Sequence, residues 1–138
     1  MISKAIWLSN VQGVNGTRCL VVTNRQVGED YSVQAKKVGF HLQNGIRYQG
    51  SVALRGNRAG TAYAALSREA SPWDNWGLWQ PVNLATAWQT IPLDFTVTGN
   101  PSPAQVRFSI MLGNFQGSVF IEDVKLWQTA SSYLLWTR

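Results

Sequence analysis

Gln105-Val-Arg-Phe-Ser-Ile-Met-Leu112 is the stretch that decides the fold of this chain. Apolar residues fall on every second position, at Val106, Phe108, Ile110 and Leu112, and alternate with Gln105, Arg107, Ser109 and Met111. Because successive side chains of a β-strand point to opposite faces, the pattern predicts a strand with one face in a core.

The same period of two recurs in short segments, which are separated by turn residues such as Asn44-Gly45 and Gly113-Asn114. Strands are expected near residues 5–9, 18–24, 32–40, 47–55, 61–67, 77–82, 89–97, 105–112 and 118–127. In the last of these the alternation changes phase, which predicts a β-bulge near Glu122 and Asp123.

The composition favours one all-β domain. Only 14% of the 138 residues are charged, whereas 12% are aromatic, and aromatic and β-branched residues suit a pleated sheet. About nine short strands with regular turns are typical of a β-sandwich. We therefore predict a single domain over residues 1–138, a β-sandwich of the jelly-roll type with two antiparallel sheets. The C-terminal tail, residues 128–138, would dock on the sandwich, cover an edge strand or face a partner.

The charges argue against nucleic acid as a partner. The chain has 12 basic and 7 acidic residues and a net charge of +5. The basic residues are scattered, and only Lys36 and Lys37 are adjacent, whereas a phosphate backbone requires a basic stripe. No apolar run has the length of a membrane span, so no membrane partner is expected. The single cysteine, Cys19, cannot form an internal disulfide and lies in an apolar run that predicts a core position.

Catalysis by this chain alone is not expected. Glycoside hydrolysis needs two carboxyl groups that face each other, but the adjacent pairs Glu29-Asp30 and Glu122-Asp123 would point to opposite faces of a strand. The lone His41 has no Ser or Cys partner pattern, and the sequence shows neither metal-ligand spacing nor a phosphate-binding loop.

Four of the seven tryptophans fall between Ser71 and Trp88. Trp73, Trp76 and Trp79 are three residues apart, but two prolines and a glycine in the run exclude a helix. A loop that leads into a strand is expected instead. An indole has a flat apolar face and one N–H donor, which matches the face and edge of a sugar ring. The alternative is that these side chains anchor the core and the loops.

Four stretches resemble family 4/9-type carbohydrate-binding modules, which are jelly-roll sandwiches attached to polysaccharide-degrading enzymes. They are Asp30-Tyr-Ser-Val-Gln-Ala35, Asn44-Gly-Ile-Arg-Tyr-Gln-Gly-Ser-Val-Ala-Leu-Arg55, Leu84-Ala-Thr-Ala-Trp-Gln-Thr-Ile-Pro-Leu-Asp-Phe-Thr-Val97 and Gly117-Ser-Val-Phe-Ile-Glu-Asp-Val-Lys-Leu126. The resemblance implies non-catalytic binding of a β-glycan chain (xylan, β-glucan or amorphous cellulose) in an aromatic-lined cleft. It also implies an extracellular domain, with its secretion signal outside this chain, that targets an appended glycoside hydrolase to its polymer.

The resemblance places ligand-binding aromatic residues at Tyr31 on one side of the cleft and at Trp73 and Trp76 on the other, with Trp79 nearby. The family's Trp-Gln residue corresponds to Trp88 and is expected to be structural.

Polar ligand-binding candidates are the residues out of phase with the core, because amide and guanidinium groups suit sugar hydroxyls. They are Gln34, Arg47, Gln49 and Arg107. The alternatives are that Arg107 is simply solvated and that Arg55 pairs with Asp94.

Asp123 matches an aspartate that helps hold a structural calcium in many relatives. The family's opening strand, with its glutamate ligand, has no counterpart here, so no cofactor is required and calcium is the one candidate metal. Residues 5–9, the tail or another chain would fill the place of that strand. Related jelly rolls also occur in virion surface proteins, so the alternative function is a structural or adhesion domain of an oligomeric virion or surface assembly.

Overall fold

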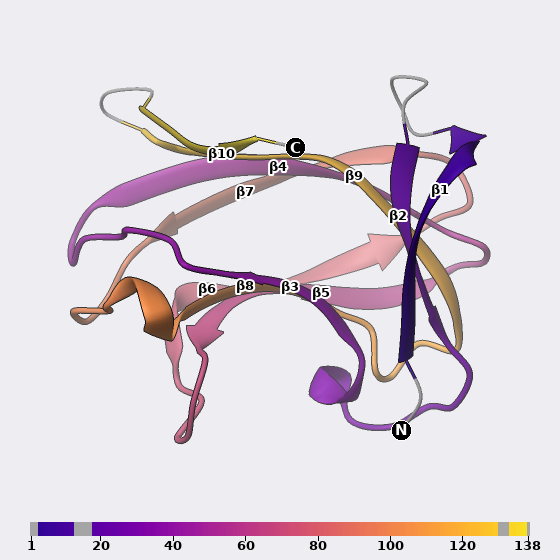
Figure 1. Cartoon of the computed structure of the whole chain (residues 1–138), viewed down its shortest axis with the longest axis horizontal. Helices are drawn as coiled ribbons and strands as arrows, with labels where there is room; N and C mark the ends of the chain where they lie inside the picture. Colours follow the sequence, from indigo (N-terminus) through magenta and orange to yellow (C-terminus); the bar gives the residue numbers. More distant parts are fainter. Residues whose placement is uncertain (1–2, 13–17, 130–132, 138) are drawn as a thin grey trace.

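The computed structural model is a β-sandwich of two antiparallel sheets (Figure 1). It describes the backbone of residues 3–12, 18–129 and 133–137 and the side chains of residues 19–129. The strands of this part are β1 (Ser3–Gln12), β2 (Arg18–Asn24), β3 (Gln34–Val38), β4 (Arg47–Gly56), β5 (Gly60–Arg68), β6 (Asn75–Leu84), β7 (Gln89–Thr96), β8 (Val106–Met111), β9 (Gly117–Gln128) and β10 (Tyr133–Thr137). The 3-10 turns η1 (Asp30–Ser32) and η2 (Pro103–Gln105) precede β3 and β8. Among these residues, no helix has the length and apolar character that a membrane span requires.

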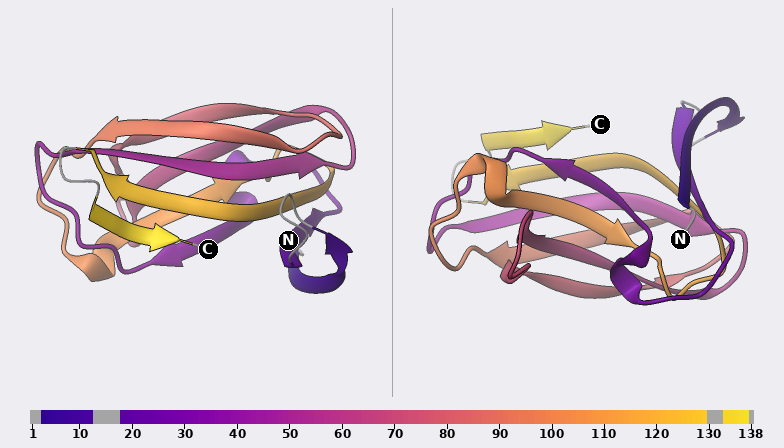
Figure 2. Two further views of the ribbon diagram at one scale, coloured as in Figure 1. Left: turned by 90° about the horizontal axis from the view of Figure 1, so that it is seen from above. Right: turned by 60° about the horizontal axis from the view of Figure 1, so that its bottom comes forward.

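The strand order is that of a jelly roll, as predicted. Sheet A has the order β1-β2-β9-β4-β7, with β10 also paired to β9, and sheet B has the order β3-β8-β5-β6. Between β2 and β9 the chain changes sheet at every connection except the one from β5 to β6. Figure 1 shows the two layers one above the other, and the left view of Figure 2 looks onto sheet A with sheet B behind it. This crossing pattern lets each strand bury one face against the opposite sheet.

The apolar residues that alternate along the predicted strands form the core between the two sheets. Val106, Phe108 and Ile110 of β8 belong to one buried apolar cluster that also contains the inward residues of β7. Tyr48 of β4 stacks on Phe95 of β7 with ring centroids 5.8 Å apart. Cys19 is fully buried, and burial raises the pKa of its thiol.

Two strands begin later than the sequence predicts, because short 3-10 turns precede them. Residues 30–32 form η1, in which the Ser32 amide donates to the Glu29 carbonyl at 3.0 Å, so β3 begins at Gln34.

The predicted bulge in β9 is confirmed. Ser51 pairs with Lys125 and Ala53 with Glu122, so two residues of β9 oppose one residue of β4.

The C-terminal tail covers a sheet edge, which is one of the three alternatives considered above. Strand β2 pairs with β9 over Gly117 to Ile121, and β10 pairs with β9 over Lys125 to Gln128. The two strands therefore share one edge of β9, and β1 pairs with β2 beyond them.

Asn24 ties together the two loops that meet at one end of the sandwich. Its buried Nδ2 atom donates to the carbonyls of Leu112, Gly113 and Phe115 at 3.2, 3.0 and 2.9 Å. Next to it the Gly28 amide donates to the Gly113 carbonyl at 2.7 Å. These contacts hold the 25–33 loop, which includes η1, against the loop between β8 and β9.

Replacing Asn24 with alanine should lower the free energy of unfolding by about 2–4 kcal/mol, because buried carbonyls would lose their donor. Urea denaturation followed by circular dichroism measures the effect. The control is Asn114→Ala, which removes the same amide from an exposed position of the second loop. Equal stability of the two variants would contradict this role of Asn24.

Candidate functional site

The outer face of sheet B, the face turned away from sheet A, carries the side chains that alternate with the core rows. Across it Tyr63 pairs with Met111, Ala65 with Ser109 and Ser67 with Arg107. The neighbouring residues of β5 and β8, such as Leu66 and Phe108, pack in the core instead. Trp79 of β6 pairs with Ala65, and Lys36 of β3 pairs with Ser109, so these residues share the outer face.

The centre of this face is buried although none of the described strands covers it. Ala65 and Ser109 have no exposed surface, and Met111 is also buried. None of the three belongs to the core cluster between the sheets. Neighbouring side chains of the same face therefore cover these three residues, which form the floor of the face.

Large aromatic side chains stand around this floor and are open to solvent. Tyr31, Trp73 and Trp79 are 60%, 56% and 51% exposed, which makes them the most exposed aromatic residues of the described part. The Trp79 ring stacks on Tyr63 with centroids 5.2 Å apart and an interplanar angle of 26°. Water-exposed indole and phenol rings on one sheet face are unusual unless they contact a ligand or partner.

Trp73 is held in place by a short loop between β5 and β6. The Trp73 amide donates to the Ala70 carbonyl at 2.8 Å, and the Arg68 amide donates to the Asp74 carbonyl at 2.8 Å. Trp73 adopts φ 62°, a left-handed conformation that residues with a side chain rarely take. Its ring lies over Arg107, with the guanidinium carbon 5.5 Å from the ring centroid.

Tyr31 lies in η1, which follows the loop that Asn24 anchors. The Gly113 amide donates to the Asp30 carbonyl at 2.9 Å, and Gln34 Nε2 donates to the Tyr31 carbonyl at 2.9 Å. Figure 1 shows η1 and the β5–β6 loop on the same side of sheet B, away from sheet A. The loops that carry Tyr31 and Trp73 therefore lie on the side of sheet B toward which Trp79 points.

The prediction that Trp76 is an exposed ligand-binding residue is wrong, because Trp76 lies in the core. It is 5% exposed, belongs to the core cluster, and donates from Nε1 to the Gln105 carbonyl at 3.1 Å. The loop expected around it ends earlier than predicted, since β6 already begins at Asn75. Strand alternation then turns Trp76 inward and Trp79 outward.

The prediction that Arg47 and Gln49 accompany the aromatic ligand-binding residues is also wrong, because both lie on sheet A. Both are in β4, where Arg47 Nε donates to Asp94 Oδ1 at 2.8 Å and Gln49 Nε2 lies 3.4 Å from Asp94 Oδ2. Asp94 thus pairs with Arg47 and not with Arg55. The guanidinium of Arg55 instead lies 3.8 Å from the ring centroid of Phe120. Of the polar candidates, only Gln34 and Arg107 share a sheet with the exposed aromatic residues.

Asp123 occupies the β9 bulge at φ 52°, with its Oδ1 atom 3.7 Å from Lys125 Nζ. Calcium takes six to eight oxygen ligands, several of them carboxylates. Within the described residues no group of three or more acidic, His or Cys side chains converges on one point. A neighbouring ammonium and a single carboxylate do not fit a calcium site, so no step below involves a metal.

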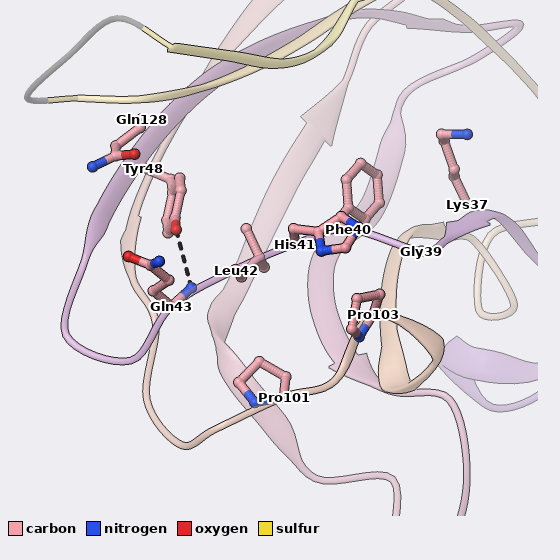
Figure 3. Close-up of a pocket in the computed structure, with 10 residues that line it drawn as sticks. All are labelled: Lys37, Gly39, Phe40, His41, Leu42, Gln43, Tyr48, Pro101, Pro103 and Gln128. Atoms are coloured by element: carbon pink, nitrogen blue, oxygen red, sulfur yellow. Dashed lines mark hydrogen bonds between the residues drawn. The ribbon is translucent and has the colours of Figure 1, made fainter.

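A cavity at one end of the sandwich was not anticipated from the sequence. It has a volume of about 620 Å³ and is lined by Lys37, Gly39, Phe40, His41, Leu42, Gln43, Tyr48, Pro101, Pro103 and Gln128 (Figure 3). The Gln43 amide donates to the Tyr48 hydroxyl at its edge. None of the predicted ligand-binding residues lines this cavity.

The sequence did not point to two charged residues of the outer face, Lys36 and Glu69, which lie next to the predicted candidate Arg107. Glu69 lies just after β5 and accepts hydrogen bonds from Lys36 Nζ at 2.9 and 3.0 Å. Arg107 Nη1 lies 3.6 Å from the same carboxylate. Glu69 and Lys36 are 33 residues apart in sequence, so only the strand order brings them together.

A jelly roll with exposed rings and hydrogen-bonding groups on one sheet face has the architecture of a ligand-binding module. The sequence matches the family 4/9 carbohydrate-binding domain over residues 6–117. The chain belongs to this carbohydrate-binding family. A comparison with curated proteins gives no match.

Solved structures of carbohydrate-binding modules share the fold. A CBM4 module has a TM-score of 0.72 and 18% identity, with 80% of this chain and 83% of that chain covered. The CBM22-1 and GH10 modules of Clostridium thermocellum xylanase 10B, solved with xylohexaose, give 0.69 and 22%, with 94% and 25% covered. The N-terminal cellulose-binding domain of Cellulomonas fimi β-1,4-glucanase C gives 0.67 and 17%, with 82% and 80% covered.

The contrast between Trp73 and Trp76 can be tested by stability. Trp73→Gly should leave the free energy of unfolding within about 1 kcal/mol of wild type, because the ring is exposed and glycine accepts the positive φ. Trp76→Ala should lower it by about 3–5 kcal/mol through the loss of a buried indole. Urea denaturation measures both. Similar losses in the two variants would place Trp73 in the core.

The Arg68–Asp74 ion pair borders the loop of Trp73 and should be visible in a titration. Hydrogen bonding from Arg68 lowers the pKa of the Asp74 carboxyl below 3.8, and Arg47 lowers that of Asp94 in the same way. Each pair is therefore intact above pH 3.8 and is lost as the pH falls through the lowered pKa. Carboxyl ¹³C NMR of Arg68→Gln should show the pKa of Asp74 returning toward 3.8. Asp94 is the internal control, and equal shifts of both carboxyls would contradict the pairing.

Proposed function

We propose that the chain binds a β-glycan such as xylan, β-glucan or amorphous cellulose across the outer face of sheet B. Tyr31, Trp73 and Trp79 would serve as platforms for the sugar rings. The observation that carries the proposal is that these three exposed rings surround a floor of small and polar side chains on one sheet face. The family to which the chain belongs supports carbohydrate as the ligand.

The chemistry of the face suits a sugar chain. The faces of β-linked pyranose rings carry C–H groups that stack on aromatic rings, and each such platform contributes about 1–2 kcal/mol. Hydroxyl groups at the ring edges require donors and acceptors in fixed positions, which Gln34 and Arg107 supply at the margin and on the floor. A few such contacts give dissociation constants of about micromolar to millimolar.

The proposed role is targeting and not catalysis. Four of the carboxylates, those of Glu69, Asp74, Asp94 and Asp123, lie in ion pairs with Lys or Arg, whereas a glycosidase needs an acid and a base that face one another. A domain of this kind would act outside the cell and hold an appended glycoside hydrolase on its polymer. The structure of the xylanase 10B modules, in which such a domain accompanies a GH10 module, supports this arrangement.

Replacing single platforms should weaken glycan binding without unfolding the domain. Tyr31→Ala and Trp79→Ala should each raise the dissociation constant by about 5- to 30-fold, because each removes one stacking surface of about 1–2 kcal/mol. Isothermal titration calorimetry with xylohexaose, cellohexaose and a mixed-linkage glucan oligomer measures the change.

The matched controls are Arg47→Ala and Gln49→Ala, which alter an exposed and a half-buried polar residue of sheet A and should change the dissociation constant less than about twofold. Loss of binding in these controls but not in the platform variants would move the site to sheet A. A wild-type chain that binds none of the three glycans but sediments as an oligomer would support the assembly-domain function instead.

A further inference from the structure

We infer that the outer face of sheet B contains a subsite for the carboxylate of a uronic acid residue, formed by Lys36 and Arg107. In this structure the carboxylate of Glu69 lies between the two cations, where the carboxylate of the ligand would bind. The inference rests on the proposed function, because it specifies the kind of glycan that the same face selects.

The geometry shows two cations from different strands converging on one carboxylate. Lys36 Nζ, on the edge strand β3, lies 2.9 and 3.0 Å from the two oxygens of Glu69. Arg107 Nη1, on the inner strand β8, lies 3.6 Å from Glu69 Oε1. Glu69 itself belongs to the loop after β5, so its carboxylate reaches over β8 from the opposite side of the face.

Arg107, next to Glu69, and Ser109, the next outer-face residue along β8, have donors that no described group uses. Arg107 is 8% exposed, Ser109 is fully buried, and neither Arg107 Nε nor Ser109 Oγ has a hydrogen-bond partner in the part of the chain that the structure describes. At 3.6 Å the contact of Arg107 with Glu69 is also longer than a hydrogen bond. A guanidinium binds a carboxylate best through two parallel N–H donors, and Glu69 does not engage Arg107 in this way. Buried donors without a partner are costly, and a second carboxylate would satisfy them.

The charge balance favours an anion over a neutral group. Lys36, Arg107 and Glu69 together carry a net charge of +1 at neutral pH, and +2 when the carboxylate of Glu69 moves away. The Glu69 side chain is 22% exposed and that of Lys36 is 46% exposed. Their ion pair is therefore accessible to water and screened, so a ligand can displace it at small cost.

The position of Trp73 explains why the anion would belong to a sugar. Its ring lies 5.5 Å from the Arg107 guanidinium, and it is carried by the same loop as Glu69. The carboxylate of a uronic acid projects from the edge of the pyranose ring. A uronic acid whose face stacks on Trp73 can therefore direct its carboxylate toward Arg107 and Lys36 from the adjoining side.

The test measures the affinities of two ligands for the wild-type chain and for two variants, Glu69→Gln and Lys36→Gln. The probes are xylohexaose and a xylo-oligosaccharide of the same backbone length that carries one glucuronic acid branch. In Glu69→Gln the amide cannot neutralise the cations, so the ratio of uronate to neutral affinity should rise about tenfold over wild type, and 0.5 M NaCl should abolish most of the gain. Lys36→Gln should lower the same ratio. Isothermal titration calorimetry gives the ratio, and thermal melting followed by circular dichroism confirms that each variant is folded.

The outcomes separate this inference from the proposed function. If xylohexaose binds but Glu69→Gln leaves the ratio unchanged or lowers it, Glu69 does not occupy a carboxylate subsite and the inference is wrong, while the proposed function stands. If the wild-type chain binds neither probe nor the other β-glycan oligomers, both fail. If Glu69→Gln does not fold, an unchanged ratio in Lys36→Gln alone overturns the subsite.

Discussion

The alternation of side chains along each strand of sheet B is the constraint on which the rest of the molecule depends. Leu66, Phe108 and Ile110 must enter the core to hold the two sheets together. Their neighbours along the strand are then directed to the outer face, because the pleat allows no other direction. Ala65, Ser109 and Arg107 therefore form the floor of a surface that the packing of the core, and not a separate element, has created.

The loops at the ends of the strands convert this floor into a bordered surface. Asn24 holds η1 against the turn after β8 and so fixes the position of Tyr31. On the other side the β5–β6 loop carries Trp73 in a left-handed conformation that costs about 1 kcal/mol. A strained backbone at an exposed indole is consistent with a side chain retained for binding, since stability alone would favour glycine there. Stability and the proposed recognition of a glycan thus depend on the same two loops.

The charged end of the face and the exposed ring of Trp73 are in direct contact. Arg107 contacts the ring of Trp73 on one side and approaches Glu69 on the other. The proposed stacking of a sugar and the proposed binding of its carboxylate would therefore occur on adjacent atoms. In a chain with a net charge of +5, the long-range field would also favour the approach of an anionic polysaccharide.

The sequence by itself determined the fold class, because a period of two in the apolar residues admits only half-buried strands, and it also indicated the bulge in β9. It identified Tyr31, Trp73 and Trp79 as candidates from residue type and resemblance. Only the tertiary structure decided which residues share a face. Arg47 and Gln49 have the expected alternation but lie on the other sheet, and Trp76 turns inward because β6 begins at Asn75. Strand order and strand starts depend on long-range pairing, which local patterns do not contain, and the same pairing brings Lys36 to Glu69 across β8.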